Sequence, residues 1–346
     1  MRTTIKDVAK YANVSPATVS LALNNRTGVS AETKKRVLQV VETLGYIPNP
    51  IARGLVCKKQ YVLGLVVTNI DNPFFSELII QVQNAIEKTE YRLLLGTSGD
   101  EVYKEKKTIE YMIDQGVDGL LIVPSRDGEQ DLEHLYHLKQ LGIPFVFVTS
   151  SYKGIQADCV MSNLENAMYE ATRFLISHGE KKIYFITDNR ELLLSSERIR
   201  GYQHAFTEQN MKYKDEWIIE TIPKIENGIL ETEKILENDH PDSIITLNAI
   251  VAMGVMKCLR DHNIKVPDDI SLICFDELPY LSILYTPVTS IKQSVKEIGQ
   301  MALQKLISRI DGGDTEFVTE YLPVEMILRE STKNRMGSSD KTGDSL

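Results

Sequence analysis

Six side chains have the chemistry to bind a small molecule; most of them lie at or after the ends of apolar runs that predict strands, and Arg198 lies in the motif ERIRGY. An arginine, an amide and a carboxylate that converge on one cleft suit a polyhydroxylated or zwitterionic molecule, and aromatic rings can line its apolar face. The six candidates are Phe74, Phe75, Thr149, Arg198, Asn248 and Asp276. A structural role is the alternative in each case, such as core or dimer packing for the rings, a surface charge for Arg198 and a turn cap for Asp276.

A second group of polar side chains lies in the stretch VSPATVSLALN at residues 14–24. Ser15 can accept a hydrogen bond from a first-turn N–H, and proline is favoured at the first helical position, so a short helix is predicted to begin at Pro16. Val19 and Leu23 share one face at i, i+4, and hydroxyls gather near the N-terminal end. Taken alone, the stretch also fits an ordinary helix of a small bundle.

The sequence lacks the motifs of the common enzyme chemistries. It contains no G-x-G-x-x-G, P-loop, nucleophile elbow or zinc-ligand spacing, and no nucleophile with a base. His134 and His137 stand at i, i+3, and without a nearby cysteine we interpret them as surface residues. We therefore expect no enzyme activity, no metal and no cofactor. The four cysteines are far apart and suit a reducing compartment; they are Cys57, Cys159, Cys258 and Cys274.

The segments around residues 14–24 predict a helix-turn-helix. Helices are expected at 4–12 (TIKDVAKYA) and at 30–45 (SAETKKRVLQVVETLG), and Asn13 tolerates the left-handed backbone that a tight turn requires. In this motif the second helix lies in the DNA major groove. The charge distribution agrees with a DNA-binding role for this region, because residues 1–60 carry ten Lys or Arg against three acids, whereas the whole chain has a net charge of −9. A basic head on an acidic body is typical of a nucleic-acid-binding module joined to another domain.

The segment YIPNPIARGLVCKKQY at residues 46–61 predicts a hinge helix that forms only when it is supported. Asn49 can cap it, but a helix of under two turns is marginal in water, and Gly54 weakens it by about 1 kcal/mol relative to alanine. A plain linker is the alternative. Leu55 is an exposed apolar residue close to Arg53, and apolar wedges can kink DNA from the minor groove.

The body of the chain, from 61 to about 330, predicts two α/β lobes. Short apolar runs alternate with helical stretches, which is typical of parallel sheets covered on both faces. The expected strands are 61–67, 91–98, 117–124 and 143–150, then, after a break near 158–163, 181–188, 216–221, 242–248 and 270–276. Ligands of open parallel sheets bind at the carboxyl ends of the strands, which here face a cleft between the lobes.

These features together resemble the LacI/GalR family of bacterial transcription regulators. The head TIKDVAKYANVSPATVSLALNN closely resembles that of the family. Later sequence motifs of the family follow in the same order along the chain: NPFF (72–75), GVDGLLIVPS (116–125), ERIRGY (197–202), DDISLICFDE (268–277) and TSIKQ (289–293). The resemblance implies a homodimer on a near-palindromic operator. It also implies that the hinge helices of two subunits lie in the minor groove, with Leu55 inserted at the centre.

The predicted fold is therefore an N-terminal all-α helix-turn-helix head with a hinge helix, joined to a two-lobed α/β core that resembles periplasmic binding proteins. The family pattern implies that the chain crosses between the lobes three times, near 160, 290 and 320. The predicted parts are a head (1–47), a hinge (48–60), an N-subdomain (61–160 with 291–320), a C-subdomain (161–290 with 321–330) and a disordered tail (331–346).

The resemblance and the residue chemistry give a set of DNA-binding candidates. We expect base contacts from Pro16, Ala17 and Leu21. Where many relatives carry an arginine, this chain has Leu21, so apolar fit and DNA shape are expected to replace arginine–guanine hydrogen bonds. Phosphate contacts are expected from Ser15, Thr18, Ser20 and Asn24, and the minor-groove contact from Leu55. The remaining DNA-binding candidates are Thr4, Ser30, Thr33, Tyr46, Asn49, Ala52 and Arg53.

The predicted cleft also departs from sugar-binding relatives. Thr149 and Ser150 replace a common Asp–Arg pair, Ala249 replaces an aspartate, and Pro223 replaces an aromatic residue. A cleft without charged hydrogen-bond partners is not expected to prefer an ordinary hexose strongly. The effector is therefore a sugar or another small metabolite, and a protein corepressor remains open as an alternative.

The expected function is that of a DNA-binding transcriptional regulator, most simply a repressor, located in the cytoplasm with the nucleoid. A solute-binding protein is the alternative for the body alone, but it requires export. The sequence shows no signal h-region and no span long enough to cross a membrane. The tail lacks leucine heptads, so a dimer is expected rather than a tetramer.

Overall fold

The computed structural model describes residues 3–23, 28–46, 59–126, 131–313 and 316–333. They fall into two compact units, Met1–Gln60 and Tyr61–Leu346, here called the head and the core. The predicted hinge helix lies almost entirely outside the described residues. Within the described ranges, every helix is too short or too polar to span a membrane.

The head contains the three predicted helices, α1 (Ile5–Ala12), α2 (Pro16–Leu23) and α3 (Ala31–Thr43). Asn13 turns the chain between α1 and α2 with φ 53°, the left-handed conformation expected for it. Val8, Val19 and Val37 contribute one residue from each helix to a small core and are fully buried. The helices are each too short to persist alone, so this shared core is what holds the motif together.

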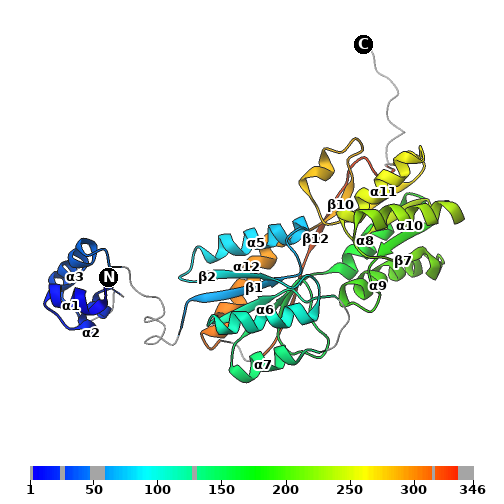
Figure 1. The fold of residues 1–346 in the computed structure, drawn as a ribbon. Coiled ribbons are helices and arrows are strands. Elements are labelled where there is room, and N and C mark those ends of the chain that lie inside the picture. Colours follow the sequence, from blue (N-terminus) through cyan, green and yellow to red (C-terminus); the bar gives the residue numbers. More distant parts are fainter. Residues whose placement is uncertain (1–2, 24–27, 47–58, 127–130, 314–315, 334–346) are drawn as a thin grey trace, which may run out of the picture. The chain divides into compact units, whose positions relative to one another are not determined.

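The core contains two six-stranded sheets, and each defines one lobe (Figure 1). The N-lobe sheet is parallel throughout, in the order β11-β5-β4-β3-β1-β2. The C-lobe sheet has the equivalent order β12-β10-β9-β8-β6-β7, and its one antiparallel pair is β10 with β12. The N-lobe strands are β1 (Val62–Val67), β2 (Arg92–Thr97), β3 (Gly119–Ile122), β4 (Phe145–Val148), β5 (Asp158–Ser162) and β11 (Thr319–Leu322). The C-lobe strands are β6 (Ile183–Thr187), β7 (Ile218–Glu220), β8 (Ser243–Thr246), β9 (Ser271–Phe275), β10 (Thr289–Gln293) and β12 (Val324–Ile327).

Helices cover both faces of each sheet, as the continuous apolar strands predict. In the N-lobe, α5 and α12 pack on one face and α6 and α7 on the other, which gives two separate apolar clusters (Figure 1). In the C-lobe, the pairs α8–α9 and α10–α11 are each in close contact. The helices are α5 (Pro73–Ile86), α6 (Val102–Asp114), α7 (Glu133–Leu141), α8 (Leu164–Ser177), α9 (Leu193–Glu208), α10 (Ile225–Asn238), α11 (Ala249–Asp261) and α12 (Val295–Ile310), with short 3-10 turns at Asp215–Trp217 and Pro279–Ser282.

The chain passes between the lobes three times. The crossings follow β5, β10 and β11, at Asn163, Ser294 and Pro323, a few residues beyond the expected positions. The eight predicted strands are all present. The prediction of a break near 158–163 was wrong, because Asp158–Ser162 forms the fully buried strand β5.

The start of the predicted disordered tail is ordered, which corrects that boundary. Ser331 is fully buried, its hydroxyl donates to the carbonyl of Leu272 at 2.6 Å, and the N–H of Thr289 donates to that hydroxyl at 2.7 Å. These bonds tie residues 331–333 to the C-lobe sheet. The remainder of the predicted tail, 334–346, lies outside the described residues.

Candidate functional site

The first turn of α2 presents hydroxyl and backbone N–H groups on the head's surface. Ser15 accepts a hydrogen bond from the Thr18 N–H at 3.1 Å, and the two hydroxyls lie 2.9 Å apart. Ser15, Pro16 and Ala17 are exposed, while Thr18, Ser20 and Leu21 are half-buried beside the Val19 core position. A helix N-terminus with this exposure is suited to a DNA groove, where N–H and hydroxyl groups bind phosphates.

The other head candidates lie at helix ends. Thr4 is exposed, and its hydroxyl and N–H both donate to Asp7 Oδ2, at 2.7 and 2.9 Å. Ser30 caps α3 by accepting from the Thr33 N–H at 3.2 Å, and Tyr46 is half-buried. The candidates Asn24, Asn49, Ala52, Arg53 and Leu55 lie outside the described residues.

In the core, the strand order reverses between β1 and β3 in the N-lobe and between β6 and β8 in the C-lobe. Such reversals open a crevice at the carboxyl ends of parallel strands. The loops that leave those ends carry Asn69 and Asn72 after β1, and Ser98 and Asp100 after β2. Further polar residues that follow strand ends are Ser125 and Arg126 after β3, Asp188 after β6, Asn248 after β8 and Asp276 after β9.

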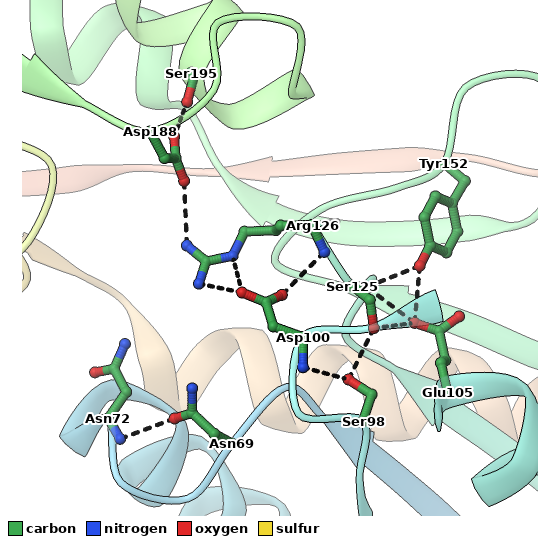
Figure 2. Close-up of polar contacts among 10 residues, drawn as sticks. All are labelled: Asn69, Asn72, Ser98, Asp100, Glu105, Ser125, Arg126, Tyr152, Asp188 and Ser195. Carbon is green, nitrogen blue, oxygen red and sulfur yellow. Dashed lines mark hydrogen bonds and ion pairs between the residues drawn. The ribbon is translucent and has the colours of Figure 1, made fainter. Parts of the chain in front are cut away.

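Arg126 connects the two lobes across this crevice (Figure 2). Its Nη2 lies 2.5 Å from Asp100 Oδ2 within the N-lobe, and its Nη1 lies 3.1 Å from Asp188 Oδ2 in the C-lobe. The Arg126 N–H also donates to Asp100 Oδ1 at 2.9 Å, and Ser195 donates to Asp188. Burial alone would lower the pKa of Arg126, but Asp100 and Asp188 outweigh it and raise that pKa above its usual value. The guanidinium is therefore a charged bridge between two carboxylates.

Arg198 and Asp276 face each other closely enough to interact in the C-lobe. Arg198, on α9, is buried, stacks over the ring of Phe275 at 4.6 Å, and has no described acceptor for its Nε–H. Burial lowers its pKa, and the charges of Asp188 and Asp276 oppose that shift. Burial raises the pKa of Asp276, while Arg198 and the bond from Gln293 Nε2 at 2.7 Å favour its ionised form. A buried guanidinium with an unpaired N–H is costly to the protein, and a ligand that accepts a hydrogen bond from it would remove that cost.

The structure gives the remaining predicted cleft residues mainly structural surroundings. Phe74 and Phe75 pack in the N-lobe core with ring centroids 5.4 Å apart, as the core-packing alternative requires. The Asn248 side-chain oxygen caps α11 by accepting from the Val251 N–H at 2.9 Å. Thr149 is buried at the end of β4 with φ 68°, and its N–H donates to the Val160 carbonyl at 2.8 Å.

A buried network behind Arg126 corrects the interpretation of His134. His134 is buried, and its Nε2 lies 2.9 Å from Oε1 of the fully buried Glu105, whereas His137 is exposed as predicted. Glu105 Oε2 accepts from the Ser125 N–H and hydroxyl, both at 2.9 Å, and from Tyr152 at 2.8 Å (Figure 2). This carboxylate therefore fixes the turn that carries Arg126. The surface prediction was wrong for His134 alone, because the carboxylate that pairs with it comes from another helix.

Replacing Glu105 with glutamine is expected to destabilise the core by about 1 to 2 kcal/mol, because one acceptor oxygen becomes a donor and leaves buried donors unpaired. Urea unfolding of the full chain measures the change. The matched control is Glu170→Gln, which removes an exposed carboxylate on α8 that pairs with Arg173 and should leave stability nearly unchanged. Equal stability of the two variants would contradict a supporting role for Glu105.

The geometry defines a class of protein: a helix-turn-helix head joined to a two-lobed α/β core. Family comparisons agree, since residues 4–49 match the lacI family of bacterial regulatory proteins and residues 60–328 match the periplasmic binding proteins and sugar-binding domain of the LacI family. The chain belongs to the LacI family of bacterial transcription regulators.

Particular relatives fit this assignment. The chain is 33% identical over 336 residues to the HTH-type transcriptional repressor PurR of Aliivibrio fischeri, covering 96% of this chain and 99% of that protein. The lac repressor dimer bound to operator and the anti-inducer ONPF shares the fold, with TM-score 0.85, 22% identity and coverage of 96% and 99%. A LacI family transcriptional regulator from Enterococcus faecium with bound ribose is 25% identical, with TM-score 0.70 and coverage of 78% and 98%. The relatives are regulators of transcription rather than enzymes.

Proposed function

We propose that this chain is a repressor that binds a near-palindromic operator as a homodimer, and that a small molecule bound between its lobes changes its affinity for DNA. The observation that carries the proposal is the pairing of two features in one chain. One is the exposed first turn of α2 in a helix-turn-helix head, and the other is the buried, unsatisfied Arg198 at the carboxyl ends of the C-lobe strands. An operator target also implies a location in the cytoplasm with the nucleoid, and the proposed function requires no cofactor.

The mechanism is a shift between lobe arrangements. A ligand that binds one arrangement better than another changes operator affinity by the difference between those two affinities and by no more. Arg126 gives the core a specific contact that differs between arrangements, because its two carboxylate partners belong to different lobes. Ribose in the Enterococcus faecium regulator supports a sugar-like effector. The replacements at Thr149 and Ala249 favour a ligand other than a common hexose.

The test combines operator selection with a ligand screen. Selection of the full chain on random duplex DNA should yield a near-palindromic sequence. A thermal-shift screen against sugars, sugar phosphates, nucleobases and amino acids should yield a compound that raises the melting temperature, because binding to the native state stabilises it. Arg198→Ala should abolish that shift, whereas Arg173→Ala, on the exposed side of α8, should retain it. Failure to select any duplex, with the head folded, would overturn the repressor assignment.

Leu21→Ala is expected to change the base preference at outer half-site positions by at most about tenfold, since apolar contacts to base edges are weaker than bidentate ones. Leu21→Arg should instead create a guanine preference of about 1 kcal/mol or more. Binding of both variants to single-base operator variants measures this. If Leu21→Ala leaves every preference unchanged, Leu21 does not contact bases.

A further inference from the structure

A second pocket of about 450 Å³ lies where the C-lobe helices α8 and α9 meet the N-lobe strand β11. Its walls include Glu165 and Tyr169 from α8, Glu197 and His204 from α9, and Tyr321 from β11. It shares none of its lining residues with the crevice spanned by Arg126. Its volume falls in the range of small-molecule sites, roughly 300 to 1,000 Å³.

Close packing of the two helices shapes this pocket. A Cβ at Gly201 would lie 2.0 Å from the Glu165 carbonyl, so the α8 and α9 backbones are in contact there. The longer side chains around that contact form the walls. The Tyr169 ring lies 4.8 Å from the His204 ring, and its hydroxyl is held by Glu208 at 2.6 Å. The aromatic wall is thus fixed in place by the chain itself.

One oxygen of the buried Glu197 carboxylate in this pocket has no hydrogen-bond partner among the described residues, although Arg200, Arg198 and the Tyr321 hydroxyl lie near enough to favour its ionised form. Arg200 Nε pairs with Glu165 Oε2 at 2.8 Å, so these two lining charges satisfy each other. Glu197 is 4% exposed, and its oxygen without a described partner is Oε2. A buried acceptor without a donor is costly to the protein, and a ligand that supplies an N–H removes that cost. The pocket therefore selects for a cation that donates hydrogen bonds.

We propose that this pocket binds a small protonated primary amine, with its ammonium group donating to Glu197 Oε2 and its carbon skeleton lying against Tyr169 and Tyr321. Aromatic faces attract an ammonium group in addition to covering apolar carbon. The pocket has walls from both lobes, so amine binding is linked to the lobe arrangement whenever the affinities differ between arrangements.

The pocket's pH response follows from Glu197. Burial raises the pKa of Glu197 to about 6; Glu165 adds to the shift, and Arg200, Arg198 and Tyr321 oppose it. Amine binding requires the ionised carboxylate, so affinity should be full near pH 7.5 and fall as the pH drops through 6. The other titratable groups that face Glu197 are Tyr169 and His204, with Cys159 from β5 beneath.

Isothermal titration of the full chain with tyramine tests the proposal, with tyrosol as a neutral probe that carries a hydroxyl in place of the ammonium group. Tyramine should bind at least about tenfold more tightly than tyrosol, as expected for a hydrogen bond to a charged group. Glu197→Gln should remove that preference, and Glu170→Gln, on the exposed part of α8, should preserve it. Circular dichroism verifies that each variant is folded.

Tyr321→Leu provides an independent variant, because Tyr321 is half-exposed and its replacement should not unfold the core. It should weaken tyramine binding about fivefold or more through loss of the aromatic face. Equal affinity for tyramine and tyrosol, or a preference that survives Glu197→Gln, would overturn the proposal. Operator binding is measured on the same samples, so loss of the amine site with intact operator binding leaves the repressor assignment unaffected.

Discussion

Replacing Arg126 with alanine is expected to shift the core away from the bridged lobe arrangement by about 2 to 3 kcal/mol, roughly 30- to 150-fold in the population ratio. The variant leaves Asp100 and Asp188 facing each other without the cation that joins them. Removal of one partner from a fully buried pair costs about 3 to 5 kcal/mol. The expected value is lower because about a quarter of the Arg126 and Asp100 side chains is exposed.

Small-angle scattering and hydrogen exchange of the full chain measure this shift. The radius of gyration should increase, and backbone exchange should accelerate in the loops that carry Asp100 and Asp188. Arg173→Ala is the matched control, because it removes an exposed arginine–glutamate pair within one helix. Unchanged scattering and exchange in Arg126→Ala would show that the bridge does not bias the lobes. If a shift is measured, Arg126→Ala can change operator affinity by no more than that shift in population.

The helix-turn-helix and most strands could be predicted from sequence because their signals are local. Asn13, the Ser15–Pro16 start and the apolar runs each determine the backbone within a few residues. Strand β5 is different, since its first residue is the acid Asp158, and an acid at this position indicates a loop rather than a buried strand. That carboxylate is paired with Arg309 Nε at 2.6 Å and accepts from the Val318 N–H at 3.0 Å. Both partners are about 150 residues away, so no local pattern indicates that an acid can begin a buried strand here.

Part of the candidate cleft could also be predicted, because some of its residues belong to local sequence patterns. The rule that ligands bind at strand ends identified Asp276, and the ERIRGY mark identified Arg198. The strand-end rule would also have identified Asp188, the last residue of KKIYFITD, had it been applied to every strand. Arg126 could not be assigned a role in this way, because its bridge depends on how two separately folded sheets face each other. His134 shows the same limit, since its burial depends on Glu105 from another helix.

Gly201→Ala is expected to destabilise the core by about 3 kcal/mol or more and to abolish effector binding. The added Cβ would lie 2.0 Å from the Glu165 carbonyl oxygen and 2.9 Å from the Tyr169 nitrogen. These are backbone atoms that cannot rotate away, so α8 and α9 must separate, and the cost exceeds the gain of about 1 kcal/mol in helix propensity. Arg198 stands one turn earlier on α9, so the same displacement moves the guanidinium from its place over Phe275.

The matched control for this variant is Gly299→Ala on α12, another glycine inside a helix at a close contact. There the nearest atom to an added Cβ is a methyl carbon of Val82 at 3.2 Å, which a small side-chain shift can relieve. Propensity gain and mild crowding should nearly cancel, leaving the free energy of unfolding in urea within about 1 kcal/mol of the parent chain. If the two variants lost equal stability, helix crowding in general, and not the α8–α9 backbone contact, would control the position of Arg198. A large loss of stability in Gly201→Ala alone would show that Gly201 is required for the close contact of the α8 and α9 backbones. That contact holds Arg198, of the same ERIRGY motif, in the cleft.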